Sequence, residues 1–401
     1  MKIIVKIVKG LLAFLVGTTV GLLLALWIAD PAVLRNLLFG QPLDAPARIE
    51  RSQPQEQVAG VAAGSTIRGE LPTGPADGLS AARLATALQL ASDTESVALL
   101  VWHEGALRYE KYWAPHTVDT RTNTNSMHKT VLAMVAGAAI ADGYIPSLES
   151  KASRWLTEWR DDARSEITLR HLLQMESGLS LPVFGTWRGI KLLLGSDLQS
   201  TVLSLPAEKS PGSDFQYSNA SSQLVELILE RATGKRYAEY LSERIWQPLG
   251  AADAALWLDR EGGSPRGFCC LFATARDWLR VGLLLESNGL WEGQQLVPAE
   301  WVQAMKAPSA LNANFGMNLW IGSPVGSERK YNDFTLKAFH SAPFVADDVY
   351  FIDGFGGQRL YLVPSRSLVV VRTGVSRVDW DDAPLLNELI LAVDEGQEER
   401  S

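Results

Sequence analysis

Ser126 and Lys129 stand three residues apart, a spacing that places two side chains on the same face of a helix. A serine hydroxyl becomes a good nucleophile when a neighbouring base takes its proton, and a partly desolvated lysine amine can be that base. The pair therefore predicts covalent serine chemistry. The same spacing occurs at Ser327 and Lys330, so the neighbouring sequence must distinguish the two pairs.

The sequence around Ser126 favours catalysis. Residues 121–125 are polar and rich in helix-capping types, whereas residues 131–140 are apolar around the whole circumference and predict a buried helix. Ser126 is thus expected in the first turn of a core helix, where free backbone N–H groups stabilise a developing anion. Burial there would also lower the pKa of Lys129. Ser327 lies in a polar stretch with Gly and Pro, so we interpret that second pair as coincidence.

A second motif, Tyr217-Ser218-Asn219, follows a turn pattern and precedes a helical pattern at residues 222–232. A tyrosine near a lysine ammonium can shuttle protons, and an asparagine amide can orient lysine and substrate together. Alone, the motif is better explained by packing of Tyr217 and helix capping by Asn219. With the Ser-x-x-Lys pair upstream, a catalytic role becomes the favoured interpretation.

These two motifs resemble those of the penicillin-recognising serine hydrolases. The matching branch is that of class C β-lactamases, D-alanyl-D-alanine carboxypeptidases and related esterases, including the β-lactamase-related hydrolases of 6-aminohexanoate oligomers. The likeness extends from about residue 80 to about residue 392. The segments that carry it occur in the family's order, at residues 98–105, 125–130, 167–179, 217–219, 248–250 and 354–358.

The resemblance implies a role for each residue of the two motifs. Ser126 would be the acylated nucleophile and Lys129 its activating neighbour. Tyr217 would be the general base that also protonates the leaving group, and Asn219 would orient the polar groups. We expect no metal and no cofactor, because the sequence contains no metal-binding or phosphate-binding motif.

The third family motif aligns with Phe355-Gly356-Gly357, where family members usually carry lysine or histidine, a small residue and glycine. The next residue, Gln358, would supply one backbone N–H to the oxyanion hole and Ser126 the other. The glycines allow close backbone approach to a ligand. An aromatic ring at Phe355 offers apolar area and no positive charge. We therefore expect a preference for neutral esters or amides over β-lactams that carry a carboxylate.

Composition is compatible with an enzyme and argues against a nucleic-acid-binding protein and a cysteine zinc site. The chain has 401 residues, of which 47% are hydrophobic, enough for a large core. A net charge of −8 argues against nucleic-acid binding. The adjacent Cys269 and Cys270 do not have the spacing of a zinc site. We expect two buried thiols, and a vicinal disulfide is the alternative. The histidines show no ligand spacing, and His128 is expected to pack or hydrogen-bond.

The N-terminal segment predicts a membrane location. Lys2, Lys6 and Lys9 precede an uncharged stretch at residues 10–29, which is long enough to span a bilayer with the N-terminus in the cytoplasm. We expect an uncleaved, single-pass anchor in the cytoplasmic membrane, with the catalytic domain exported to the periplasm. A cleaved signal peptide, and hence a secreted enzyme, is the alternative.

The expected elements favour one hydrolase domain. Strand patterns at both ends of the chain surround a mostly helical middle, which predicts one antiparallel sheet flanked by helices and built from both chain ends. The family resemblance adds a β-lactamase/transpeptidase-like α/β fold with an inserted all-α lobe. The expected divisions are an anchor or signal segment (1–35), a linker (36–78), the hydrolase domain (79–395) with its lobe at about 142–270, and a polar tail (396–401).

We therefore predict an exported, membrane-anchored serine hydrolase that acts through an acyl-enzyme on small-molecule esters, amides or peptides. Two alternatives stay open: a β-lactamase or peptidoglycan D,D-carboxypeptidase, and a non-catalytic binding protein on the same fold. A Ser-His-Asp hydrolase is disfavoured because the chain has no Gly-x-Ser-x-Gly motif. Loops at residues 182–189 and 312–317 are expected to form pocket walls, and no pattern fixes an oligomeric state.

Overall fold

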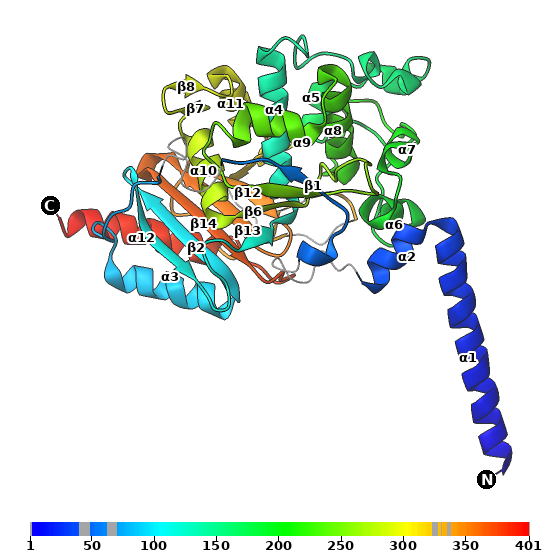
Figure 1. The fold of residues 1–401 in the computed structure, drawn as a ribbon. Coiled ribbons are helices and arrows are strands. Elements are labelled where there is room, and N and C mark those ends of the chain that lie inside the picture. The colour runs from blue at the N-terminus through cyan, green and yellow to red at the C-terminus, as the bar shows by residue number, and fades with distance from the viewer. Residues whose placement is uncertain are drawn as a thin grey trace.

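The computed structural model describes residues 2–39, 49–61, 70–322, 328–329, 331–334 and 338–400 (Figure 1). Two parts of the predicted linker, residues 40–48 and 62–69, lie outside the described residues, as do Ser327 and Lys330 of the second Ser-x-x-Lys pair. The described chain forms a six-stranded and a four-stranded antiparallel sheet with helices packed around them.

The main sheet joins strands from both ends of the chain, as the sequence predicts. β2 (Ser96–His103) pairs antiparallel with β14 (Leu368–Gly374), and Val101 lies opposite Val370. Both strands are buried along their whole length, which their nearly unbroken apolar sequences explain. The strand order is β3 (Ala106–Tyr112), β2, β14, β13 (Gln358–Val363), β12 (Val349–Gly354) and β9 (Trp320–Gly322).

Helices cover both faces of this sheet (Figure 1). Alternate residues of a strand point to opposite faces, so Leu100 belongs to the apolar cluster that includes α10 (Ala275–Glu286). Its neighbour Val101 belongs to the cluster that includes α3 (Ala81–Asp93) and α12 (Ala383–Glu398). The sheet is therefore the buried middle layer between two layers of helices.

A mostly helical region beside the sheet is built around α4 (His128–Ala141) (Figure 1). Of the 14 residues of α4, 12 are buried, as expected for a helix that is apolar on all sides. It packs against α8 and α11. The other helices of this region are α5 (Leu169–Leu173), α6 (Trp187–Leu194), α7 (Leu198–Leu203), α8 (Asn219–Thr233), α9 (Tyr237–Leu241) with the π-helical turn Ser242–Trp246, and α11 (Ala299–Lys306).

Gly137 of α4 allows the close approach of Trp301, whose indole N–H donates to the Ala133 carbonyl. A Cβ added at Gly137 would lie 2.4 Å from the Trp301 ring. We expect Gly137→Ala to lower the free energy of unfolding by about 1–3 kcal/mol, because the ring must move within a close-packed core. Urea unfolding measures this loss. Ala141→Ser, at the exposed end of the same helix, should stay within about 0.5 kcal/mol of the wild type. Equal stability of the two variants would contradict the packing argument.

The smaller sheet has the strand order β1 (Gln55–Val58), β5 (Ala254–Trp257), β6 (Leu271–Thr274) and β4 (Arg121–Asn123). Its first strand lies within the predicted linker, where Val58 is fully buried opposite Ala254. β4 ends three residues before Ser126, so this sheet fixes the start of the segment that carries the serine. Two short hairpins pair β7 (Leu290–Trp291) with β8 (Gln294–Gln295) and β10 (Glu328–Arg329) with β11 (Ala338–Phe339).

Two helices form the N-terminal segment, α1 (Lys2–Ala29) and α2 (Pro31–Leu38). α1 extends away from the body, whereas α2 lies against it next to α6 (Figure 1). The Asp30 carboxylate caps the first turn of α2, and the buried Asn36 amide donates to the Leu194 carbonyl at 2.7 Å. These contacts dock α2 on the helical region.

The sequence-based prediction of a membrane anchor at residues 10–29 is wrong. A spanning helix needs about 20 consecutive, mainly apolar residues, and across the described ranges no helix combines that length with enough apolar character. Three further predictions depend on that anchor and are wrong as well: a transmembrane helix, a single-pass location and the membrane as a partner.

Candidate active site

Ser126 lies in a 3₁₀ turn, Asn125–Met127, that continues directly into α4. The sequence predicts the first turn of the helix itself, and the difference arises at Asn125, whose φ of 52° departs from helical geometry. Asparagine tolerates this left-handed conformation. The Asn125 N–H donates to the Asn123 side chain, and the Asn125 amide donates to the Phe355 carbonyl at 3.1 Å. The turn that holds the serine is thereby tied to the glycine-rich segment.

Lys129 is buried in the first turn of α4, and its side chain has three hydrogen-bond acceptors. Nζ donates to Ser126 Oγ at 2.7 Å, to Asn219 Oδ1 at 2.9 Å and to the Phe268 carbonyl at 2.7 Å. Burial lowers the pKa of Lys129 to about 7, and the Asp353 carboxylate opposes the shift. An amine with this pKa is partly neutral near pH 7 and can take a proton from a serine hydroxyl.

Asn219 is the first residue of α8, but it does not cap that helix. Ser218 is the N-cap, and its hydroxyl accepts from the Ala220 N–H at 3.2 Å. Because the neighbouring serine satisfies the helix terminus, the Asn219 side chain is available to contact Lys129. Ser218 therefore caps the helix, and Asn219 contacts Lys129.

Tyr217 is held beside Ser126 by aromatic packing. Lys129 Nζ is 5.0 Å from the centre of the Tyr217 ring. Burial raises the pKa of Tyr217 above its usual value, the Asp353 carboxylate raises it further, and an interaction with the Ser126 side chain lowers it in part. The residue is therefore a neutral phenol at pH 7. Three rings with centroids 6.0, 5.7 and 5.3 Å away pack against it, those of Phe315, Trp320 and Tyr331.

The glycine-rich motif forms the tight turn between β12 and β13. Gly356 and Gly357 adopt φ values of 80° and 85°, a region that favours glycine. At Gly354, a Cβ would lie 2.0 Å from the Thr124 carbonyl. Glycine at that position therefore allows the hairpin to approach the turn that carries the serine.

Gln358 and Phe355 occupy different environments on this hairpin. Gln358 is fully buried, and its side-chain amide bonds with both the N–H and the carbonyl of Gly374. It begins β13, which packs with β12 against the turn that carries the serine. Phe355 is 48% exposed and brings no charge to the hairpin.

Four buried charged residues adjoin the hairpin, and the sequence analysis missed them. Arg329 pairs with Asp353 at 3.0 Å and with Asp382 at 2.8 Å, and Arg359 pairs with the same carboxylates at 2.5 and 2.7 Å. Each side chain is at most 10% exposed, and the two positive charges cancel the two negative ones. Asp353 and Arg359 directly flank residues 354–358, a charge pattern that was available in the sequence. No sequence signal links Arg329 to them.

The adjacent cysteines are joined in a disulfide, so the favoured prediction of two thiols is wrong. The φ of 69° at Cys270 turns the backbone so that neighbouring side chains can meet. His128 has the predicted hydrogen-bonding role: its ring bonds with the Cys269 carbonyl at 2.9 Å and with the Tyr237 hydroxyl at 2.8 Å.

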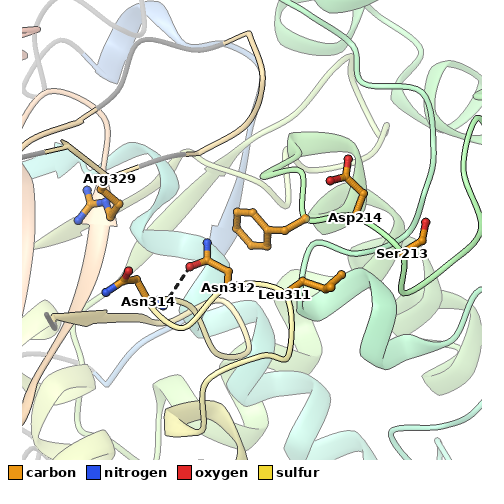
Figure 2. A pocket seen from close by; sticks show the side chains of 7 residues that line it. Ser213, Asp214, Leu311, Asn312, Asn314 and Arg329 are labelled. Carbon is orange, nitrogen blue, oxygen red and sulfur yellow. Dashed lines mark hydrogen bonds between the residues drawn. The ribbon is translucent and has the colours of Figure 1, made fainter. Parts of the chain in front are cut away.

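The structure has a pocket of about 340 Å³ whose lining includes Asn312, Asn314 and Arg329 (Figure 2). Asn312 and Asn314, from the predicted wall at residues 312–317, line this pocket, whereas none of residues 182–189 does. Ser126, Lys129 and Tyr217 do not line it either, so the predicted walls of a pocket at the serine stay a prediction. Phe215, which lines this pocket, has its ring centre 5.2 Å from that of Phe315, one of the rings that pack against Tyr217. The lining consists of Ser213, Asp214, Phe215, Leu311, Asn312, Asn314 and Arg329.

The chain is similar to known proteins over most of its length. The family model described as Beta-lactamase matches residues 81–394. The 6-aminohexanoate-dimer hydrolase of Paenarthrobacter ureafaciens is 26% identical over 319 residues, which cover 75% of this chain and 77% of that enzyme. Esterase EstB of Burkholderia gladioli is 30% identical over 155 residues, 35% of this chain and 39% of the esterase.

The fold is shared with solved structures. A Bacillus anthracis protein provisionally named as a 6-aminohexanoate-dimer hydrolase superimposes with a TM-score of 0.68 at 21% identity, over 88% of this chain and 92% of that protein. The family match covers most of the chain, and the ordered Ser-x-x-Lys and Tyr-x-Asn motifs meet in one place in the structure. The chain belongs to the β-lactamase family of serine hydrolases.

Proposed function

We propose that this enzyme hydrolyses neutral esters or amides through an acyl-enzyme formed on Ser126. The observation that carries the proposal is the 2.7 Å hydrogen bond between Lys129 Nζ and Ser126 Oγ at a buried lysine. A buried amine beside a serine hydroxyl is an arrangement that activates the serine. Similarity to a hydrolase of 6-aminohexanoate dimers and to an esterase supports this reaction class.

In the proposed acylation step, Ser126 Oγ bonds to the substrate carbonyl carbon while its proton passes to neutral Lys129. The raised pKa of Tyr217 keeps it a phenol, so we assign it a proton relay rather than the general base that the family resemblance implies. Through Tyr217 the proton reaches the leaving oxygen or nitrogen as the C–O or C–N bond breaks. Water then attacks the acyl group, gives up a proton and releases the acid, and Ser126 regains its hydrogen.

Two backbone N–H groups are assigned to the oxyanion that forms during these steps. They belong to Ser126 and Gln358, and the packing of the serine turn against β12 and β13 supports the pairing. Donors fixed in place before the reaction stabilise the developing negative charge without reorganisation. Asn219 is assigned the orientation of Lys129, to which it already hydrogen-bonds at 2.9 Å.

The charges around the site favour a neutral acyl donor. Phe355 places an exposed ring where the family usually has a cation. Arg329 and Arg359 are both paired with the carboxylates of Asp353 and Asp382, so neither presents an uncompensated positive charge. A substrate carboxylate bound here would lose hydration without gaining a full ionic partner.

A p-nitrophenyl ester is expected to be hydrolysed with a kcat/KM about 10- to 150-fold above that for nitrocefin, since a missing charge-assisted contact costs about 1.5–3 kcal/mol. Phe355→Lys should raise the nitrocefin value about tenfold by supplying that contact, whereas Phe355→Leu should not. Steady-state kinetics on both substrates measure these values. Equal rates of ester and nitrocefin hydrolysis by the wild type would contradict the neutral-substrate proposal.

The acyl-enzyme itself is tested by intact-protein mass spectrometry after exposure to activated esters and penicillins. An acyl-enzyme adds the mass of the acyl group, and peptide mapping places it on Ser126. A larger adduct yield from penicillins than from esters would favour a β-lactamase or carboxypeptidase. Absence of an adduct from every donor would favour a binding protein.

A further inference from the structure

Lys129 must direct its lone pair at Ser126 in order to act as a base. A neutral amine has two N–H groups and one lone pair. Asn219 Oδ1 and the Phe268 carbonyl can only accept hydrogen bonds, so they take the two N–H groups and leave the lone pair facing the serine hydroxyl. The position of the Phe268 carbonyl therefore decides which way the base points.

The Cys269–Cys270 disulfide follows Phe268 directly in the chain. Phe268 and Cys270 are almost completely buried, and the φ of 69° at Cys270 lies in a region that residues other than glycine rarely adopt. The Cys269 N–H donates to the Arg266 carbonyl at 3.0 Å, and the Trp257 N–H donates to the Cys270 carbonyl at 3.2 Å. One hydrogen bond holds each end of the cysteine pair, and the disulfide is the additional link that fixes the geometry between those ends.

His128 ties the same segment to the helix that carries Lys129. Burial lowers the pKa of His128 to about 4, so the ring is neutral at pH 7 and has one donor and one acceptor. Nδ1–H donates to the Cys269 carbonyl, and Nε2 accepts from the Tyr237 hydroxyl. Consecutive residues of α4 therefore hold consecutive carbonyls, His128 that of Cys269 and Lys129 that of Phe268.

We propose that the Cys269–Cys270 disulfide and His128 are positioning groups that hold the Phe268 carbonyl on Lys129, so that acylation depends on the redox state of the disulfide. The inference rests on the proposed role of Lys129 as the base for Ser126. An added dithiol reductant would remove the constraint. The S–S bond of the enzyme breaks, two electrons and two protons pass to the cysteine sulfurs, and the reductant closes to its own disulfide. The segment then loses its covalent link, and its carbonyl is free to leave Lys129.

The first experiment compares the oxidised and the dithiothreitol-reduced full chain with a p-nitrophenyl ester. Reduction should expose two titratable thiols and lower the acylation rate constant by about tenfold or more, because small misplacements of catalytic groups have large effects. The acid limb of the pH profile should also move to higher pH. A loosened segment admits water to Lys129, which weakens the effect of burial and raises the pKa of the amine. Far-ultraviolet circular dichroism, which reports the backbone structure, should stay unchanged, and reoxidation should restore the rate.

Variants keep the inference testable if reduction is slow or incomplete. The double variant Cys269→Ser/Cys270→Ser should be acylated as slowly as the reduced enzyme, and dithiothreitol should not change its acylation rate constant. His128→Asn retains an N–H donor and should stay faster than His128→Phe. The inference is overturned if the isolated enzyme already has two free thiols, or if reduction leaves both the rate and the pH profile unchanged. A failure of the proposed function would look different, because the oxidised enzyme would then form no adduct on Ser126.

Discussion

Ser126→Ala is expected to abolish ester hydrolysis, lowering kcat by at least about 10⁴-fold. Alanine cannot form the acyl bond, so only binding and the oxyanion donors remain to assist direct attack by water. The fold should persist, because Ser126 is only partly buried and Lys129 keeps its other two acceptors. Initial rates with a p-nitrophenyl ester give kcat, and intact mass should show an acyl adduct on the wild type but none on the variant.

Ser365→Ala is the matched control for this loss. Its hydroxyl bonds with the Asp348 carboxylate on the surface at 2.8 Å, so removing it should leave kcat and the adduct unchanged. Substantial hydrolysis by Ser126→Ala, or an adduct on another side chain in that variant, would place the nucleophile elsewhere. The outcome would then overturn the proposed function at its central residue.

The fold was predictable wherever a long segment has one unambiguous pattern. The apolar runs at Val97–Val101 and Leu368–Val371 predict strands, and the structure pairs these strands in the interior of the main sheet, buried on both faces. The smaller sheet was not predicted, because strands of three or four residues such as Arg121–Asn123 acquire their geometry from partners far along the chain. Local propensity carries too little free energy to specify them.

The site was predictable where residue type carries the signal. Ser126, Lys129, Tyr217 and Asn219 have distinctive side chains in fixed order. In the structure Lys129 Nζ hydrogen-bonds with both Ser126 and Asn219 and lies 5.0 Å from the centre of the Tyr217 ring. The Phe268 carbonyl could not have been found this way, because every residue has a backbone carbonyl and only the tertiary fold selects one.

Lys129→Met should lower kcat/KM for a p-nitrophenyl ester by about 10²–10⁴-fold, the range typical of a lost general base. Methionine fills the same volume without an amine, so the buried site stays packed. The variant should still bind substrate, and its residual rate should lose the dependence on pH near neutrality. Stopped-flow acylation kinetics separate this chemical effect from any change in binding.

The wild-type pH profile gives the sharpest test of the same assignment. Since burial lowers the pKa of Lys129 to about 7, the neutral amine is the minor form below that pH and the major form above it. The acylation rate should therefore rise about tenfold per pH unit up to roughly pH 7 and then level off. Lys306 provides the control, because burial also lowers its pKa but it lies on α11 and donates to the Leu285 carbonyl. Lys306→Met should keep the wild-type profile. If the rise of the acylation rate up to about pH 7 persisted in Lys129→Met, another group would be titrating. The assignment of Lys129 as the base for Ser126 would then be wrong.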